Sequence, residues 1–336
     1  MAGYRKSSPQ QRSQDRRSDA EERRLFKEAL REYHRRQVRK KRLRALLAVL
    51  AIAAIVLYLC WPRLMKLIHP EEPPLPADDR LKVCFIDVGQ GDSTLITAGG
   101  KTMLVDCGEE EFAGDAAKFL KSSGIERIDY LVGTHPHSDH MGGMDRIIEE
   151  FGIGEFIIPH LDDEDIPTTS YFLRFLDAAE SHGVKLTEAV TGSEFTVGDA
   201  HCEIVAPNSK KYEDINNYSV GIVLRHGSES FIFTGDAEGV AEQEMLGGGR
   251  LGKMNVYKVG HHGSSSSSTA AFLNVIRPDT AVISCGAGNA YGHPTDSVIR
   301  RLSAYTDNIY RTDLCGSIVI TSDGSSLNVT AERRSR

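Results

Sequence analysis

An uninterrupted apolar segment near the N-terminus divides the chain into parts that must fold in different surroundings. It covers residues 45–61, 17 positions without a charge or a proline. As a helix it would be about 25 Å long, just enough to cross a thin bilayer. The alternative is a buried core helix, but an all-round apolar helix after a dense basic block fits a membrane span better. We expect an uncleaved signal anchor, because no small-residue cleavage motif follows it.

The charge on the two sides of this segment is strongly unequal. Residues 1–44 hold 16 Lys and Arg against 6 Asp and Glu, a net charge of +10, whereas the remainder holds 24 against 41, a net charge of −17. The positive-inside rule then predicts a single-pass protein of the cell membrane, with a cytoplasmic N-terminus and an extracytoplasmic domain. The basic tail itself is expected to be solvated or to bind lipid headgroups, with nucleic-acid contact as the alternative.

Prolines separate the expected anchor from the largest part of the chain. Residues 69–79, HPEEPPLPADD, contain four prolines, which cannot continue a helix and favour an extended spacer. The five cysteines beyond the anchor have no CxxC spacing, which predicts mostly buried thiols, with a single bridge as the alternative. We therefore predict a basic cytoplasmic tail (1–44), a transmembrane signal anchor (45–61), a Pro-rich linker (62–79) and a folded domain (80–332).

Strands and helices alternate along this last region. The sequence predicts, in order, strands at 81–87, 92–98 and 102–106, a helix at 115–125 and a strand at 129–135. Residues 141–152 are expected to begin with a close-packed Gly-Gly turn and to continue as a helix. The second half is also rich in short apolar runs that end in turn residues. Two β-rich halves, each with its own helices, predict an α/β fold in which helices cover the outer faces of two sheets.

Histidines crowd the end of the strand predicted at 129–135. In THPHSDHMGGM, residues 134–144, three histidines and an aspartate lie within six positions. Alternate residues of an extended segment point the same way, so His135 and His137 can bind one ion. After the chain turns, Asp139 and His140 can face a second ion. Imidazole and carboxylate ligands suit zinc or manganese, whereas the alternative is a histidine-rich surface loop.

Distant residues of the same chemical kind also follow apolar strands. Asp236 lies in FTGDA, His261 and His262 lie in VGHHGS, and Asp106 ends MLVDCG. One aspartate at a strand end is more often a turn or cap residue, but together these residues indicate a site for two divalent metal ions. Such ions activate water and stabilise developing negative charge without a serine or cysteine nucleophile. The predicted reaction class is hydrolysis.

These motifs resemble the metallo-β-lactamase superfamily, whose fold is an αββα sandwich. A narrower resemblance is to the hydrolase domain of ComEC-type DNA-internalisation competence proteins, over about residues 81–322. The motifs that follow its order are FIDVGQGDSTLI, LVDCG, THPHSDHMGG, FTGDAE, KVGHHGSSSSSTAAFL, VISCGAGNAYGHP and YRTDLCGSIVI. The resemblance does not extend to the multi-helix membrane channel of those proteins, since only one apolar span precedes this region here.

The resemblance also implies ligand sets. The first metal would be held by His135, His137 and Asp236, and the second by Asp139, His140, Asp236 and one of His261 and His262. Asp106 would orient the ligands from behind. A further histidine ligand of the superfamily is expected where this chain has Asn217 and Ser219, which predicts weaker or different occupancy of the first position.

Several other residues are candidates for lining the site. Asp92 and Ser93 follow the GQG turn and could equally form a simple turn. Ser264 begins a run of five serines, which is either a flexible loop or a source of hydroxyl donors. His293, in a loop that matches the family, could donate to a phosphate oxygen or a leaving group, so the candidate catalytic residues are Asp139, His261 and His293. The spare histidines are expected to be ordinary polar or packed residues: His160, His182, His201 and His226.

The resemblance implies a membrane-anchored phosphodiesterase or nuclease that acts on extracytoplasmic DNA in a competence-like process, with a DNA-uptake channel as partner. The net charge of −17 beyond the tail complicates this prediction, because long polyanions usually meet a basic surface. One alternative is therefore hydrolysis of a small phosphoester, ester or lactone at the same two metals. Another is a tethered binding domain without catalysis.

Overall fold

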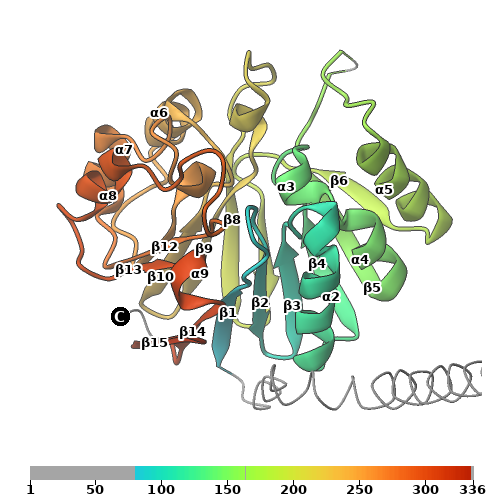
Figure 1. Cartoon of the computed structure of the whole chain (residues 1–336), viewed down its shortest axis with the longest axis horizontal. Helices are drawn as coiled ribbons and strands as arrows, with labels where there is room; N and C mark the ends of the chain where they lie inside the picture. The colour runs from blue at the N-terminus through green and yellow to red at the C-terminus, as the bar shows by residue number, and fades with distance from the viewer. Residues whose placement is uncertain (1–79, 163, 334–336) are drawn as a thin grey trace, which may run out of the picture. The chain divides into compact units, whose positions relative to one another are not determined.

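The computed structural model describes residues 80–162 and 164–333 (Figure 1). The predicted tail, anchor and linker lie outside these residues and stay predictions. Within the described ranges, no helix is both long and apolar enough to cross a bilayer.

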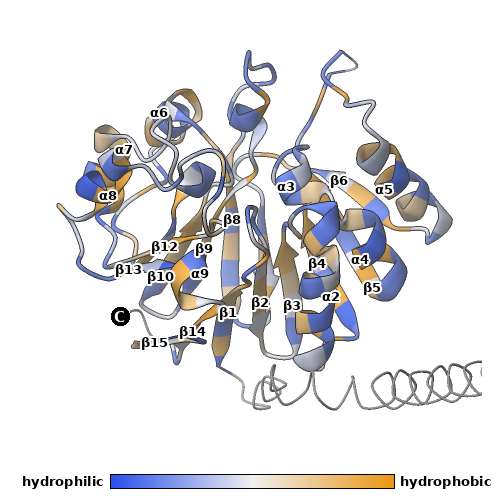
Figure 2. Ribbon diagram, viewed as in Figure 1, coloured by the Kyte–Doolittle hydropathy of each residue, from blue (hydrophilic) through white to orange (hydrophobic). Residues whose placement is uncertain are grey.

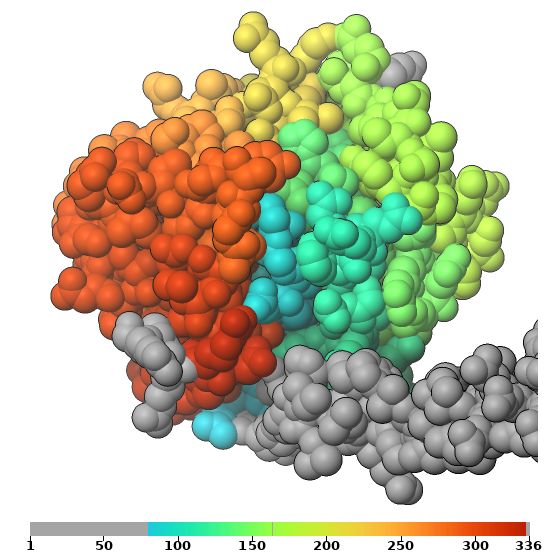
Figure 3. Space-filling view, in the orientation of Figure 1, coloured from blue at the N-terminus to red at the C-terminus, as the bar shows by residue number. Residues whose placement is uncertain are grey.

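The first sheet has eight strands and collects both ends of the described region. In spatial order they are β15 (Leu327–Ala331), β14 (Ile318–Ser322), β1 (Leu81–Phe85), β2 (Thr94–Ala98), β3 (Lys101–Val105), β4 (Arg127–Val132), β5 (Gly152–Ile158) and β6 (Lys185–Glu188). β14 pairs antiparallel with β1, so the red C-terminal segment lies beside the blue start of the domain in Figure 3. From β3 to β6 the strands run parallel. Their C-terminal ends therefore meet at one edge of the sheet.

The second sheet repeats this arrangement with seven strands. In spatial order they are β13 (Ile309–Arg311), β12 (Thr280–Ile283), β11 (Val256–Lys258), β10 (Glu229–Phe233), β9 (Gly221–His226), β8 (Ala200–Ala206) and β7 (Glu194–Val197). β10, β11, β12 and β13 are parallel, whereas β7 to β10 pair antiparallel. The parallel half again presents the C-terminal ends of its strands at a common edge.

Helices cover the outer face of each sheet, and the two inner faces pack on each other. The helices on the first sheet are α2 (Ala113–Ser122), α4 (Met144–Glu150) and α5 (Ser170–Ser181), and those on the second are α6 (Gly239–Gly247), α7 (Ala270–Ile276) and α8 (Asp296–Leu302). Between the sheets, the rings of Phe85 and Phe233 lie 6.3 Å apart. The predicted αββα sandwich is confirmed.

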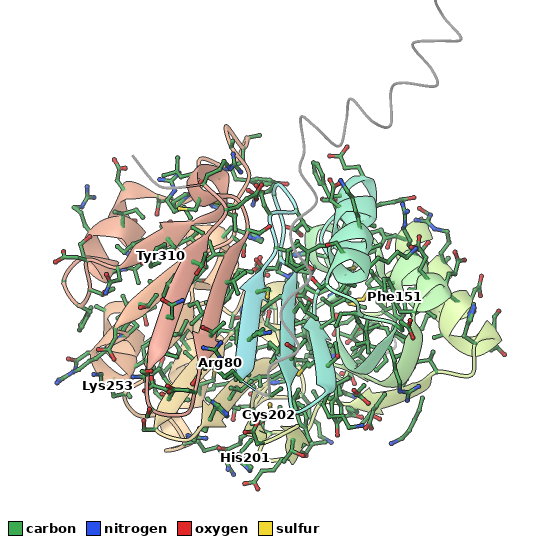
Figure 4. The ribbon with its side chains drawn as sticks, turned by 90° about the horizontal axis from the view of Figure 1, so that it is seen from below. Arg80, Phe151, His201, Cys202, Lys253 and Tyr310 are labelled. Carbon is green, nitrogen blue, oxygen red and sulfur yellow. The ribbon has the colours of Figure 1, made fainter. Side chains whose placement is uncertain are left out.

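Strands buried on both faces explain the continuous apolar runs in the sequence (Figure 2). In β1, Val83 and Phe85 pack between the sheets, whereas Cys84 packs beneath the helices. Phe151, labelled in Figure 4, belongs to the same layer between the first sheet and its helices. The five cysteines in the described residues are buried, as expected from their spacing, and form no disulfide with one another.

One predicted element near the histidine motif has the wrong bounds. The strand predicted at 129–135 ends at Val132, because Thr134 turns its backbone N–H toward the carboxylate of Asp106. The Gly-Gly turn predicted before the next helix is formed by Gly142 and Gly143, which lie between α4 and a short helix that was not predicted, α3 (Ser138–Met141). A Cβ on Gly143 would lie 2.2 Å from the Cβ of Ala113 at the start of α2. The glycine pair therefore allows close packing that an uninterrupted side-chain-bearing helix would prevent.

Candidate metal centre

The metal-capable residues lie just beyond the C-terminal ends of parallel strands in both sheets. Asp106 follows β3 and residues 135–140 follow β4 in the first sheet. Asp236 follows β10 and His262 follows β11 in the second. Because both sheets bring these ends to the same edge of the sandwich, residues more than a hundred positions apart in sequence become neighbours.

Four side chains converge on one point at this edge. The ligand atoms of Asp139, His140, Asp236 and His262 all lie within 4.8 Å of one another. His140 Nε2 is 3.1 Å from Asp236 Oδ1, and His262 Nε2 is 3.1 Å from Asp139 Oδ2. The two Nε2 atoms are 3.3 Å apart. Two imidazoles and two carboxylates at this spacing are a donor set suited to a divalent cation such as zinc or manganese.

A buried atom without a partner supports this fit. Asp236 is 2 % exposed, and its Oδ1 makes no hydrogen bond of acceptable geometry although His140 Nε2 lies nearby. A buried carboxylate oxygen with no hydrogen bond is costly unless a cation compensates it. The residues present therefore fit a metal ion at this point.

The ligand set that the resemblance implies for the first metal is less complete. His135 is buried, and its Nε2 lies 3.0 Å from Nδ1 of the half-exposed His137. Among the described residues, however, His135, His137 and Asp236 do not form a group of three donors within 4.8 Å of one another. The structure thus brings two imidazoles together at the first position without completing a group of three close donors among the described residues.

The adjacent histidines 261 and 262 occupy different places. His262 is buried in the four-donor cluster, whereas His261 lies at its border, with Nε2 3.6 Å from Asp236 Oδ2 and Nδ1 3.5 Å from Glu238 Oε1. Both histidines have positive φ values, 50° and 51°. This left-handed conformation costs non-glycine residues about 1–3 kcal/mol each and persists only where surrounding contacts require it. Here it turns consecutive side chains toward the same centre.

Asp106 holds His140 from behind. Its Oδ2 accepts hydrogen bonds from His140 Nδ1 and from the Thr134 hydroxyl, each at 2.8 Å, and its Oδ1 accepts one from the Thr134 backbone N–H. All three residues are buried. Because Nδ1 of the His140 imidazole is occupied by this hydrogen bond, Nε2 is the nitrogen that faces the cluster. The orienting place expected for Asp106 is therefore the one it occupies, but Thr134 was not foreseen.

A buried ion pair stands behind His262. His262 Nδ1 donates to the backbone carbonyl of Ser284 at 3.0 Å and lies 3.5 Å from Asp92 Oδ1. The other oxygen of Asp92 accepts a hydrogen bond from Lys258 Nζ at 2.6 Å, and Lys258 is 3 % exposed. Asp92 thus lies behind the ligands, not on the cavity wall, and Ser93 beside it is buried. Sequence reasoning missed Lys258, although a lysine inside an apolar strand directly before the histidine pair was a usable signal.

The carboxylates and imidazoles of the cluster control one another's charge. Burial alone would lower the pKa of His140, but the carboxylates of Asp236, Asp106 and Asp139 together outweigh it and raise this pKa well above its ordinary value. The same balance raises the pKa of His262. Burial would raise the pKa of Asp139, but the two imidazoles lower it to about 2. His135, by contrast, has its pKa lowered by burial and by His140. The metal-free cluster therefore holds protons that a cation would displace.

The cluster opens into a cavity of about 390 Å³, lined by residues that include Asp139, Asp236, His262, Tyr171, Tyr291 and His293. Two other hollows lie at the opposite edge, around Lys101 and Asp129, whose side chains pair with each other at 3.0 Å. Neither of those hollows contains a histidine. The chemistry therefore belongs to the cavity at the strand ends.

Comparison with known proteins agrees with this geometry. Residues 86–287 match the family described as the Metallo-beta-lactamase superfamily. The chain belongs to this superfamily. The metallo-beta-lactamase fold and the four-donor cluster together support a metal-dependent hydrolase.

Three relatives confirm the narrower resemblance to ComEC-type competence proteins. ComE operon protein 3 of Bacillus subtilis is 29% identical over 255 residues, 70% of this chain and 32% of that protein. Recombination protein 2 of Haemophilus influenzae is 31% identical over 70% of this chain and 28% of its own length. Competence protein ComA of Neisseria gonorrhoeae is 31% identical over 74% of this chain and 33% of its own length. The chain thus spans about a third of the length of these relatives.

The superfamily pattern has a histidine ligand where this chain has Asn217 and Ser219. These two residues make different contacts. Asn217 Oδ1 accepts a hydrogen bond from the backbone N–H of Glu238 at the start of α6. Ser219 is fully buried, accepts a hydrogen bond from the Asp236 backbone N–H at 3.0 Å, and has its Oγ 3.3 Å from His135 Nδ1. Ser219 therefore links two predicted ligands, whereas the side chain of Asn217 accepts hydrogen bonds from the first turn of α6.

The serine run beside the metal centre is tied down at several points. Ser264 Oγ pairs with Ser266 Oγ, which lies 3.3 Å from His261 Nδ1. Ser268 is fully buried, and its backbone carbonyl accepts a hydrogen bond from Arg301 Nε at 2.8 Å. The structure therefore differs from the flexible-loop alternative. Ser264 contacts His261 through its backbone N–H, which donates to the His261 carbonyl at 2.7 Å, and its side chain reaches His261 through Ser266.

His293 lines the cavity, as its loop suggested. The side chain of Asn289 brackets its backbone: Asn289 Nδ2 donates to the His293 carbonyl, and His293 N–H donates to Asn289 Oδ1. Burial and the nearby His261 lower the pKa of His293, which keeps it neutral at neutral pH. The spare histidines do not line the cavity, and His226 is a packed residue. His226 is buried, with Nδ1 3.0 Å from Ser322 Oγ and Nε2 3.1 Å from Asp199.

Proposed function

We propose that the chain is a membrane-anchored, metal-dependent phosphodiesterase that cleaves nucleic acid outside the cytoplasm in a competence-like process. The observation that carries the proposal is the convergence of Asp139, His140, Asp236 and His262 at the floor of an open cavity. A cation held there would be reached from the cavity that Asp139, Asp236 and His262 line. The relatives point to the biological setting, since two of them are named as a ComE operon protein and a competence protein.

The metals, zinc or manganese, would be held at two positions. His135 and His137 would contribute to the first, and the four-donor cluster would form the second, with Asp236 facing both. Bound there, divalent cations lower the pKa of water and neutralise charge that develops on a phosphoryl oxygen.

The chain's own residues keep this arrangement ready for substrate. Asp106 and the Ser284 carbonyl fix the Nδ1 atoms of His140 and His262, so both Nε2 atoms face the cavity floor. Because these imidazoles are buried and hydrogen-bonded, little reorganisation is needed when substrate arrives. His293 on the cavity wall is neutral and can donate a hydrogen bond to the departing oxygen.

The membrane part of the proposal comes from the N-terminal sequence. The apolar segment 45–61 would anchor the protein, and the +10 tail would hold the N-terminus in the cytoplasm. A DNA-uptake channel is the proposed partner. Fractionation with protease protection tests this placement: the domain should be digested in intact spheroplasts while an N-terminal tag survives.

A second candidate is a hydrolase of small phosphoesters, esters or lactones. It is favoured by the walls of the cavity, where no lysine or arginine is found among the described residues. A long polyanion is usually bound through such side chains, whereas a small ester needs only the metal centre and a fitting cavity.

The deciding experiment is a substrate panel with the purified full-length chain in detergent and added manganese or zinc. Single-stranded DNA, methyl p-nitrophenyl phosphate and nitrocefin represent the competing classes. We expect both phosphodiesters to be cleaved, and Asp139→Ala to abolish cleavage. Asp162→Ala is the matched control, since its side chain is 45% exposed and pairs with the remote His160.

Cleavage of nitrocefin alone would replace the proposal with carbon-ester chemistry. Metal binding without turnover of any substrate would identify a tethered binding domain. Phosphodiester cleavage that survives Asp139→Ala would show that the four-donor cluster is not the reaction centre.

A further inference from the structure

Tyr291 is an exposed aromatic residue at the mouth of the catalytic cavity. Its side chain lines the cavity together with His293, yet the residue is 69 % exposed, the highest value among the large hydrophobic residues of the described chain. Exposed aromatic surface is unfavourable in water and, beside a binding site, commonly belongs to the recognition of a ligand.

The ring of Tyr291 is held in a defined orientation. It stacks on the imidazole of His293, with ring centres 5.8 Å apart and planes inclined by 24°. His293 in turn lies edge-on to His261, 5.7 Å away, and its backbone is bracketed by the side chain of Asn289. A continuous line of rings therefore runs from the solvent-exposed tyrosine toward the metal centre.

The charges on the cavity walls limit how a nucleic acid can be recognised. Glu109, Asp139 and Asp236 line the cavity, and no lysine or arginine is among its described residues. Phosphates other than the reacting one thus find no basic partner there. The bases can be recognised in another way, because each has a flat π-face that stacks on an aromatic side chain without requiring charge.

We propose that Tyr291 is a stacking platform for the nucleobase next to the scissile phosphodiester. The inference rests on the proposed function and names its substrate class: single-stranded nucleic acid or nucleotide diesters with an unpaired base. A base inside a duplex is already stacked and paired, so it cannot cover the tyrosine ring without being extruded. The platform therefore selects for single strands and tolerates any sequence.

The test compares two small diesters that release the same p-nitrophenol: thymidine 5′-(p-nitrophenyl phosphate) and methyl p-nitrophenyl phosphate. The wild-type chain with manganese should prefer the thymidine ester, with the difference mostly in KM. Tyr291→Ala should reduce the ratio of the two kcat/KM values by about 5- to 100-fold, the range expected for loss of one base–aromatic stack. Tyr291→Phe, which keeps the ring, should retain the ratio.

Val190→Ala is the matched control, because Val190 is 55 % exposed and is not among the residues that line the cavity. It should leave both activities unchanged. An unchanged ratio in Tyr291→Ala, or equal use of both esters by the wild type, would overturn the stacking inference while the proposed function stands. Failure of the wild type to hydrolyse either ester would instead overturn the proposed function, and the inference with it.

Discussion

The Nδ1 atom of His140 lies 2.8 Å from the Asp106 carboxylate, and both side chains are buried. Asp106→Asn keeps the shape and tolerates the positive φ of 58° at this position, but removes the negative charge behind the imidazole. We expect metal affinity to fall about 10- to 100-fold, as is typical when an orienting carboxylate is lost. Competition with a chromogenic chelator measures this. If both the metal affinity and the unfolding temperature of Asp106→Asn were unchanged, Asp106 would be a turn residue without a role in orienting His140.

The ion pair between Lys258 and Asp92 should be important for stability. Lys258→Met leaves a buried carboxylate without its partner and should lower the free energy of unfolding by about 3–5 kcal/mol, measured in urea. The double variant with Asp92→Asn should recover much of this loss, because the unpaired charge is gone. Lys101→Met is the matched control: the Lys101 side chain is 56% exposed, so loss of its pair with Asp129 should change stability by less than about 1 kcal/mol. Equal effects of the two lysine variants would contradict this prediction.

Metal affinity should depend on pH over an unusually high range. Carboxylates raise the pKa values of His140 and His262, so in the metal-free chain both imidazoles keep their protons above the ordinary histidine pKa of about 6.5. A raised pKa means that the competing proton is lost only as the pH rises further. Manganese affinity, measured from free manganese by electron paramagnetic resonance, should therefore continue to increase between about pH 7 and 9. His201→Ala, at an exposed histidine paired with Glu194, should leave the profile unchanged; a profile that is flat above pH 7 would refute the prediction.

The order of the serine run should depend on Arg301. Its guanidinium donates to the carbonyls of Ser267 and Ser268, each at 2.8 Å. Arg301→Met should accelerate amide hydrogen exchange in residues 264–269 by about tenfold or more, because hydrogen bonds to a charged group contribute about 1.5–3 kcal/mol. The neighbouring Arg300 is exposed, and Arg300→Met provides the control. Slow exchange in both variants would show that other contacts suffice to order the run.

The position of the metal centre could be predicted because it follows from simple rules. Apolar strands that end in aspartate or histidine place those side chains at one edge when the strands are parallel. This was enough to bring together Asp139, His140 and Asp236. The superfamily motifs then identified the sandwich that contains them.

Other features depend on packing that no local pattern encodes. Which of His261 and His262 enters the cluster is decided by two successive positive φ values, and these persist only because the surrounding fold requires them. Lys258 pairs with Asp92, which lies 166 positions away in the sequence. The early end of β4 likewise follows from the contact between Thr134 and Asp106, two residues that lie 28 positions apart.

The metal centre also spans the two halves of the sandwich. Asp139 and His140 come from the first sheet, whereas Asp236 and His262 come from the second, with 122 positions between the two histidines. A cation held by all four would be a reversible cross-link across a long loop, and closing such a loop restricts the unfolded chain. The five cysteines of the described domain form no disulfide with one another that would restrict the chain in the same way. Metal supply would thus determine how long the domain stays folded as well as its catalytic rate. A chelator would shorten the lifetime of the folded state.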